Sequence, residues 1–308
     1  MRVFLTGATG FIGSAIVPEL INAGHQVLGL TRSDAGAESL RAAGAEVHRG
    51  NLDDLESLRK GAARSEGVIH CAFDHSAFGG DFSKFVEVCD KDRRAIEALG
   101  DVLKGSDRPL VITSGTGMGT AAPGQPATED LFDHTHPNPR KVSELAGAAV
   151  AERGVNVSVV RLPQVHDTIR QGLITHAVQA AREKGAAAYI GEGLNRWPAV
   201  HVLDAAHLYR LVLERREAGI RYHAVAEEGV TMRAIAEGLG RALKVPVISL
   251  PPDAAPAHFG WLAMFAGMDM PASSAQTRQR LGWNPTGPGL ISDLDQMRQR
   301  APLVGQSV

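Results

Sequence analysis

Three glycines near the start of the chain have a spacing that lets backbone atoms bind phosphate. Gly7, Gly10 and Gly13 follow an apolar segment, residues 3–5, and precede an apolar pattern of helical period. The first glycine permits a tight turn, the second lets the backbone approach a pyrophosphate, and the third lets a helix pack close to the strand. The N–H groups and the dipole of that helix attract phosphate. A chance glycine turn would lack this strand and helix, so the pattern predicts a dinucleotide site.

The residues after the second apolar segment, 26–31, bear on which dinucleotide binds. A site for NAD usually places an acidic residue here, where it binds both ribose hydroxyls. This chain has no carboxylate before Asp34 and offers instead Arg32 and Ser33, a planar cation and a hydroxyl suited to a 2′-phosphate. We therefore expect NADP(H) to be preferred over NAD(H); the alternative is that Arg32 is a solvated surface arginine.

Hydride transfer to a carbonyl also needs a proton donor. Ser114 ends a predicted strand, so we expect it to hydrogen-bond a substrate oxygen, although a serine there can simply make a turn. His136, with an intrinsic pKa of about 6.5, is a candidate donor; the alternative is an exposed loop histidine. A bound water is a third candidate. His134 and His136 form a His-x-His pair, but the segment adds no defined ligand, and we expect no metal site.

Alternating strand and helix patterns position these residues. Strands are predicted at 2–6, 26–31, 45–48, 67–71, 109–114 and 155–161, and helices at 11–23, 35–43, 53–60, 82–104 and 140–153. The predicted fold is therefore α/β, a Rossmann-type doubly wound parallel sheet covered on both faces. The segment 115–139, rich in Gly, Pro and Thr, follows the fifth strand at the edge where such sheets bind ligands, so we expect a functional loop.

The second half of the chain has a less regular pattern. Helices are predicted near 169–184, 204–216, 231–242 and 254–267, and strands near 221–226 and 246–250. We interpret residues 1–165 as an NAD(P)-binding Rossmann domain. Residues 166–308 are interpreted mainly as a smaller substrate-binding lid, with segments near 198–226 returning to the sheet.

The composition of the chain argues against some classes of partner. The 308 residues are 44% hydrophobic and 21% charged, with a net charge of −2, so no basic surface for nucleic acid is expected. No apolar run has membrane-spanning length, and no signal peptide fits, because the first strand begins at residue 2. Two cysteines, Cys71 and Cys89, do not suggest a disulfide framework. We expect a cytoplasmic protein that binds a small-molecule substrate, without a membrane or nucleic acid partner.

Several segments together resemble the extended short-chain dehydrogenases/reductases, the superfamily of the NAD-dependent epimerases and dehydratases. The matching segments are Thr6-Gly7-Ala8-Thr9-Gly10-Phe11-Ile12-Gly13, Asn51-Leu52, Val68-Ile69-His70-Cys71-Ala72, Val111-Ile112-Thr113-Ser114-Gly115, Arg161-Leu162-Pro163-Gln164-Val165 and Trp197-Pro198-Ala199-Val200-His201-Val202-Leu203-Asp204. The resemblance covers nearly the whole chain. It implies a dinucleotide cofactor, a catalytic serine at Ser114 and a family expectation of a homodimer.

The resemblance also assigns residues to the cofactor. Asn51 stands where the family usually has an aspartate that contacts adenine, which keeps an acceptor oxygen but loses the charge. The fourth strand lies against the adenosine ribose, and residues 161–165 lie beside the nicotinamide. With Arg32 and Ser33, the expected cofactor-binding residues are Thr6, Gly7, Thr9, Gly10, Phe11, Ile12, Gly13, Asn51, Leu52, Cys71, Ala72, Phe73, Leu162, Pro163 and Val165.

The chain departs from the family at its catalytic pair, a tyrosine followed four residues later by lysine. Residues at that spacing after Tyr189, Tyr209 and Tyr222 are Gly193, Leu213 and Ala226. The catalytic helix should begin near 136–141, where His136 and Arg140 have the spacing of the missing pair. By this resemblance Arg140 or Lys141 replaces the family lysine at the ribose; the alternative is that both are surface cations. The chain thus resembles atypical members that lack the pair.

We therefore predict an NADP(H)-dependent oxidoreductase. It would reduce a carbonyl, or oxidise the alcohol, of a small and fairly apolar substrate, with Ser114 positioning the substrate oxygen. One alternative is a nucleotide-sugar epimerase or dehydratase, although those reactions also depend on the absent tyrosine. Another is a non-catalytic sensor or regulator that binds NADP.

Overall fold

The computed structural model describes residues 1–77, 82–122 and 124–297. Its centre is a seven-stranded parallel sheet with the order β10-β6-β5-β4-β1-β2-β3. The strands are β1 Arg2–Thr6, β2 Gln26–Thr31, β3 Glu46–Arg49, β4 Gly67–His70, β5 Pro109–Gly115, β6 Asn156–Leu162 and β10 Arg221–His223. The chain order reverses between β1 and β4, which is where doubly wound sheets bind ligands. The predicted fold class is confirmed.

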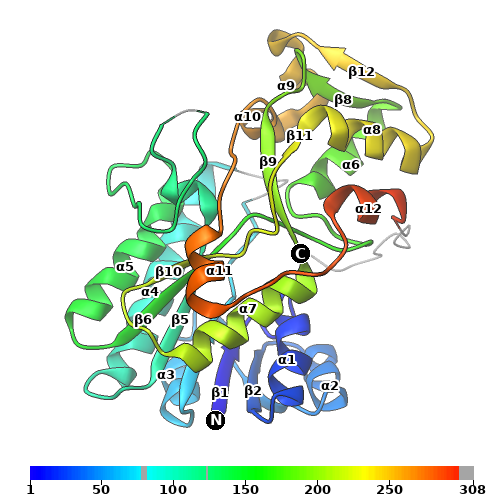
Figure 1. Ribbon diagram of the computed structural model, residues 1–308. Coiled ribbons are helices and arrows are strands. Elements are labelled where there is room, and N and C mark those ends of the chain that lie inside the picture. The colour runs from blue at the N-terminus through cyan, green and yellow to red at the C-terminus, as the bar shows by residue number, and fades with distance from the viewer. Residues whose placement is uncertain (78–81, 123, 298–308) are drawn as a thin grey trace.

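Helices cover both faces of this sheet, because its strands are apolar on both sides (Figure 1). One face carries α1 Gly13–Asn22, α2 Asp34–Ala42 and α7 Val202–Arg215. The other carries α3 Leu55–Ala63, α4 Phe85–Leu103 and α5 Val142–Glu152. The strand residues Leu5 and Phe4 are fully buried against opposite faces, so adjacent residues of β1 contribute to two separate cores.

A smaller upper region stands above the carboxyl ends of the strands (Figure 1). It contains a three-stranded sheet of β7 Gln164–His166, β9 Arg196–His201 and β11 Glu227–Thr231, and a pair of β8 Ala187–Ile190 with β12 Val247–Leu250. Its helices are α6 Ile174–Lys184, α8 Met232–Leu243, α9 Ala255–Phe259, α10 Ala263–Ala266 and α12 Leu290–Asp295. We call these elements the upper region. They share a core of their own, around Trp197 and Phe259.

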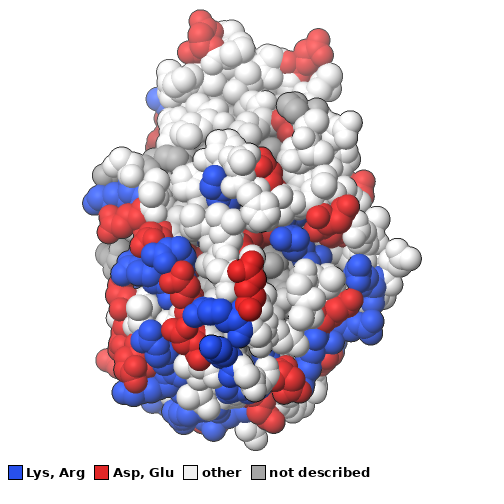
Figure 2. Space-filling view, turned by 90° about the vertical axis from the view of Figure 1, so that its left-hand side faces the viewer, with Lys and Arg blue, Asp and Glu red and all other residues white. Residues whose placement is uncertain are grey.

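A helix near the end of the chain packs against the larger part. The helix α11, Ala275–Leu281, packs against α7 and β10 of the larger part. Figure 2 shows charged side chains gathered over the lower part, whereas the upper region is largely uncharged on that face. No helix among the described residues is long and apolar enough to cross a membrane. The division of the chain near residue 165 stays a prediction.

The structure corrects several predicted elements in the second half. The helix predicted at 254–267 is broken into α9, a 3-10 turn at 260–262 and α10, because Gly260 has φ +56°. The helix predicted at 169–184 begins only at Ile174, because Asp167 and Gln164 accept hydrogen bonds from backbone amides of residues 169–173. The strands β7, β8, β9 and β11 and the helices α11 and α12 were not predicted.

Candidate functional site at the carboxyl edge of the sheet

The glycine turn has no room for side chains and leaves backbone amides available. Gly7 has φ +72°, and a Cβ there would lie 2.7 Å from the Ala72 amide nitrogen. A Cβ on Gly13 would overlap the Gly7 carbonyl. The helix α1 starts without a side-chain cap, so its first N–H groups are not bonded to a capping side chain. The turn therefore fits a dinucleotide pyrophosphate at the junction of β1 and β4.

Two arginines lie at the carboxyl ends of β2 and β3, near the predicted site for the adenosine end of a dinucleotide. Arg32 is exposed directly after β2. Arg49, opposite Thr31 on β3, forms an ion pair with Asp34. The hydroxyl of Ser33 accepts a hydrogen bond from the Gly36 amide and retains its proton for donation. Arg49 was not predicted from the sequence; its signal would have been its position at the end of the third strand.

Asn51 has a local role in this structure. Its Oδ1 accepts hydrogen bonds from the amides of Asp53 and Asp54, at 2.8 and 3.0 Å. The oxygen that would serve as an acceptor for adenine is thus shared with the turn before α3, while Nδ2 remains a donor. The neighbouring Leu52 packs partly against the core under α3 and α4.

A chain of buried polar side chains runs below the glycine turn. The hydroxyl of Thr6, the last residue of β1, lies 2.7 Å from Nδ1 of His70. Nε2 of His70 lies 3.1 Å from Oδ1 of Asp92 on α4. The other carboxylate oxygen of Asp92 accepts hydrogen bonds from Arg140 Nη1 and from the Ser143 hydroxyl, both at 2.6 Å. Burial alone would raise the pKa of Asp92, but the Arg140 charge and the bonds from His70 and Ser143 hold that pKa well below its usual range.

Arg140, one of the predicted catalytic residues, is bonded to the edge of the sheet. Its Nη2 donates to the carbonyl oxygen of Thr113 at 3.1 Å, one residue before Ser114. Its guanidinium carbon lies 4.0 Å from the centre of the Phe73 ring, which follows β4. These contacts fix the guanidinium between the ends of β4 and β5, and only 14% of the side chain is exposed.

Ser114 lies at the end of β5 and is 4% exposed. Its Oγ makes no hydrogen bond of normal geometry within the described part of the chain, although it lies near enough to Glu144 to help lower the pKa of that carboxyl. Burial tends to raise the pKa of Glu144, and the adjacent Arg161 outweighs it. A buried serine hydroxyl with unused bonding capacity stands at the ligand edge of the sheet.

Arg161 binds the main chain of the long segment 115–139. This fully buried arginine forms an ion pair with Glu144, 2.8 Å from Nε to Oε1. Its Nη1 and Nη2 donate to the carbonyl oxygens of Thr128 and Leu131, at 3.2 and 2.8 Å. Nη1 also lies 3.2 Å from Nε2 of His223 on β10. One buried ion pair therefore connects α5, β6 and the loop that leads to Arg140.

His136 and Lys141 are placed differently from Arg140. His136 accepts a hydrogen bond from the Asn138 amide on Nδ1 at 3.1 Å, so its resolved side-chain bond is local to the loop. Lys141 makes no side-chain hydrogen bond or ion pair with residues in the described ranges. No hydrogen bond in these ranges joins either residue to Ser114. The structure brings Arg140, Thr113 and Phe73 together, and leaves the roles of His136 and Lys141 as predictions.

A tyrosine lies below the site but is closed off from it. The hydroxyl of Tyr209, on α7, lies 2.6 Å from Oγ1 of Thr113 and also contacts Cys71. Burial raises the pKa of Tyr209 well above its usual value and raises that of the Cys71 thiol to about 11. The bond to Thr113 joins α7 to the sheet. Because Tyr209 is 0% exposed, it does not take the position of the missing catalytic tyrosine.

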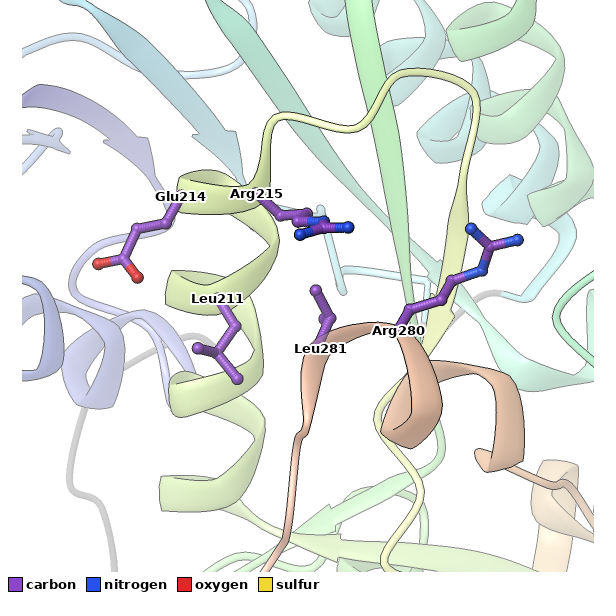
Figure 3. A pocket seen from close by; sticks show the side chains of 5 residues that line it. All are labelled: Leu211, Glu214, Arg215, Arg280 and Leu281. Carbon is purple, nitrogen blue, oxygen red and sulfur yellow. The ribbon is translucent and has the colours of Figure 1, made fainter.

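The remaining predicted residues lie near the same edge. Leu162 ends β6 and packs partly against the core, and Val165 on β7 is buried. A separate depression lies between α7 and α11, lined by Leu211, Glu214, Arg215, Arg280 and Leu281 (Figure 3). Its α7 residues belong to the last part of that helix, which leads towards the start of β10, so the depression lies at the opposite edge of the sheet from the glycine turn. Among the described residues no group of three potential metal ligands gathers.

Comparison with known proteins adds the family. A model of the NAD dependent epimerase/dehydratase family matches residues 3–226. The chain belongs to this family. A protein of Schizosaccharomyces pombe, Uncharacterized protein C2A9.02, is 47% identical over 96% of this chain and 98% of its own length. UDP-glucose 4-epimerase of Streptomyces lividans is 26% identical, with 92% of each chain covered.

Solved structures share the fold. The structure of DesIV, a dTDP-glucose 4,6-dehydratase from Streptomyces venezuelae with NAD and TYD bound, superposes with a TM-score of 0.75 at 20% identity, covering 96% of this chain and 95% of that one. Family members that resemble this chain include epimerases, dehydratases and reductases. The chain is thus an NAD(P)-dependent enzyme of the epimerase/dehydratase family.

Proposed function

We propose that this protein is an NADP(H)-dependent oxidoreductase that reduces a carbonyl, or oxidises the corresponding alcohol, of a small and fairly apolar substrate. The observation that carries the proposal is the fixed Arg140 guanidinium, bonded to the Thr113 carbonyl beside the buried Ser114 hydroxyl. A cation and a hydroxyl at the ligand edge of the sheet suit a carbonyl oxygen that gains negative charge.

Each residue would have a separate role in the reduction of the carbonyl. When bound, the nicotinamide cofactor supplies or accepts the hydride. Ser114 donates a hydrogen bond that orients the substrate oxygen, and Arg140 stabilises the negative charge that develops there. Arg140 cannot itself supply the proton, because a guanidinium stays charged at any physiological pH. The proton comes from His136 or from a water held in the site, and the two sources are distinguished by replacing His136.

The preference for NADP(H) rests on the end of β2. Arg32 is exposed there without a carboxylate partner among the described residues, and the Ser33 hydroxyl keeps a proton to donate. Arg49 adds a second cation on the neighbouring strand, although Asp34 partly neutralises it. A 2′-phosphate would meet two guanidinium groups where an NAD site has a carboxylate.

The upper region supports an apolar substrate and serves as the lid in this proposal. Its helix α6 carries His176, whose ring packs against Trp261 with centroids 4.8 Å apart. Burial is the main cause that lowers the pKa of His75 after β4, and the charge of His176 on α6 contributes in the same direction. An aromatic lid that carries few charged side chains on the face seen in Figure 2 favours an apolar molecule over a nucleotide sugar.

A panel of carbonyl compounds with NADPH, followed at the nicotinamide absorbance, tests the function. We expect substrate-dependent oxidation of NADPH that falls by at least about 100-fold in Ser114→Ala. Ser158→Ala is the matched control, because Ser158 is another buried strand serine, but lies in the middle of β6. NADPH binding without turnover on any compound would favour a sensor, and turnover of nucleotide sugars alone would favour an epimerase or dehydratase.

A further inference from the structure

The polar chain Thr6–His70–Asp92–Arg140 links the glycine turn to the start of α5. These residues come from four separate elements: β1, β4, α4 and the turn before α5. Thr6, His70 and Asp92 are each at most 1% exposed, and the bonds between successive members are 2.7, 3.1 and 2.6 Å. Arg140 is the most exposed of the four, at 14%, and is the member that bonds the Thr113 carbonyl beside Ser114.

The hydrogen bonds of this chain have one consistent direction when the His70 ring is neutral. Ionised Asp92 can only accept, so His70 donates from Nε2 and must accept on Nδ1. The Thr6 hydroxyl therefore donates to His70, and the Thr6 oxygen accepts the Ala72 amide at 3.3 Å. The Ala72 amide thus donates to Thr6, Thr6 donates to His70, and His70 donates to Asp92.

A buried carboxylate is a costly way to join two helices. Apolar residues already pack α4 against α5, through contacts such as Leu99 and Val150 in one core. Burying a charge is strongly unfavourable unless hydrogen bonds and an opposite charge compensate. Asp92 receives all of these, from His70, Ser143 and Arg140. This complete pairing immobilises the guanidinium that projects beyond it.

We propose that Asp92 and His70 are positioning residues that hold Arg140 at the end of β5, and that Thr6 couples this arrangement to the dinucleotide turn. Binding of the cofactor and the placement of Arg140 then depend on each other. The catalytic part of this inference rests on the proposed function, whereas the coupling to cofactor binding does not.

A double-mutant cycle on NADPH binding and on turnover tests the inference. We expect Asp92→Asn to weaken NADPH binding about 3-fold or more, measured by nucleotide fluorescence, and to lower kcat about 10-fold or more while changing the substrate KM little. In an Arg140→Gln background the same change should have almost no further effect on either quantity, because Asp92 acts through Arg140. Equal effects of Asp92→Asn in both backgrounds would overturn the proposal.

Controls separate positioning from folding. Asp90→Asn alters another α4 carboxylate, one that pairs with Arg93 and Arg94 at the surface, and should leave NADPH binding and kcat unchanged. Loss of stability by itself would lower Tm in both backgrounds without coupling to Arg140. If Asp92→Asn does not fold, Ser143→Ala removes one donor to Asp92 and takes its place in the cycle. No change in NADPH binding with the folded variant would overturn the proposal.

The outcomes also separate this inference from the proposed function. If the wild-type protein turns over no carbonyl compound, the proposed function fails, and the binding arm of the cycle still decides the coupling. If turnover is found but Asp92 and Arg140 act additively, the function stands and the positioning role is wrong.

Discussion

The guanidinium of Arg140 donates to the main-chain oxygen of Thr113, which places a permanent cation one residue before Ser114 at the edge of the parallel sheet. From the sequence we predict that Arg140 or Lys141 replaces the family's lysine, with His136 at the spacing of the missing tyrosine, and this assignment stays a prediction. The planar guanidinium bonds Asp92 and Thr113 at the same time, which a single ammonium group would do with much less constraint.

Replacement of Arg140 should therefore reveal a large contribution to catalysis. We expect Arg140→Ala to lower kcat/KM by about 100-fold or more, the loss typical of one donor at a developing oxyanion. Arg140→Lys should recover only part, since it cannot bridge both partners. Lys141→Ala distinguishes the two neighbouring cations, and a loss there equal to that of Arg140→Ala would contradict the preference for Arg140. Steady-state kinetics on the best carbonyl substrate supplies all three values.

Replacement of Arg32 tests the choice of cofactor. We expect Arg32→Ala to raise KM for NADPH about 10-fold or more and to change KM for NADH little, because only NADPH has the 2′-phosphate. Arg41→Ala, an exposed arginine in the last turn of α2, is the control and should alter neither value. Equal rises in both KM values would show that Arg32 does not bind the 2′-phosphate.

The larger part of the fold could be predicted because its signals are local. The strands at 2–6 and 26–31 are continuous apolar runs next to glycine turns, and their observed bounds are those predicted. In the upper region the strands are three to six residues long and carry residues such as Pro198 and Gly229, so their pattern resembles that of loops. Pairing with distant strands, not local preference, makes them extended.

The polar chain behind the candidate site could not be predicted in the same way. Asp92 belongs to the run Asp90-Lys91-Asp92-Arg93-Arg94, which is typical of the solvated side of a helix. Its burial follows from the packing of α4 beneath the ends of β4 and β5, and its partners lie 22 and 48 positions away in the chain. His136 shows the converse, because its sequence spacing suggested a role, while its observed bond is to its own loop.

The ion pair between Glu144 and Arg161 should dominate the stability of the long loop. We expect Glu144→Gln to lower the free energy of unfolding by about 3–5 kcal/mol, because it leaves the Arg161 charge buried without a carboxylate. Hydrogen exchange should rise in residues 128–131, whose carbonyl oxygens Arg161 binds. Glu97→Gln, which breaks a partly exposed pair with Arg93 on α4, should cost about 1 kcal/mol or less in urea unfolding. Similar losses for the two variants would contradict this role of Glu144.

The same cluster should make stability depend on pH through His223. Burial, and then the charge of Arg161, lower the pKa of His223 in the folded protein to about 3, below the ordinary 6.5. Between these two values the unfolded chain binds the proton and the folded protein does not. The contribution of His223 is therefore fully present above about pH 6.5 and is lost as the pH falls towards 3, by at most about 1.4 kcal/mol per pH unit.

Urea unfolding at several pH values between 4 and 7 measures this dependence. His223→Gln keeps polar atoms near Arg161 and the Ser273 carbonyl but does not titrate, so its free energy of unfolding should fall less steeply with acid than that of the wild type. His207→Gln is the control, because it removes a half-exposed histidine on α7 that has no contact with Arg161 among the described residues. Parallel curves for wild type and His223→Gln would mean that the proton on His223 does not control acid unfolding, and that Arg161 tolerates a charged histidine beside it.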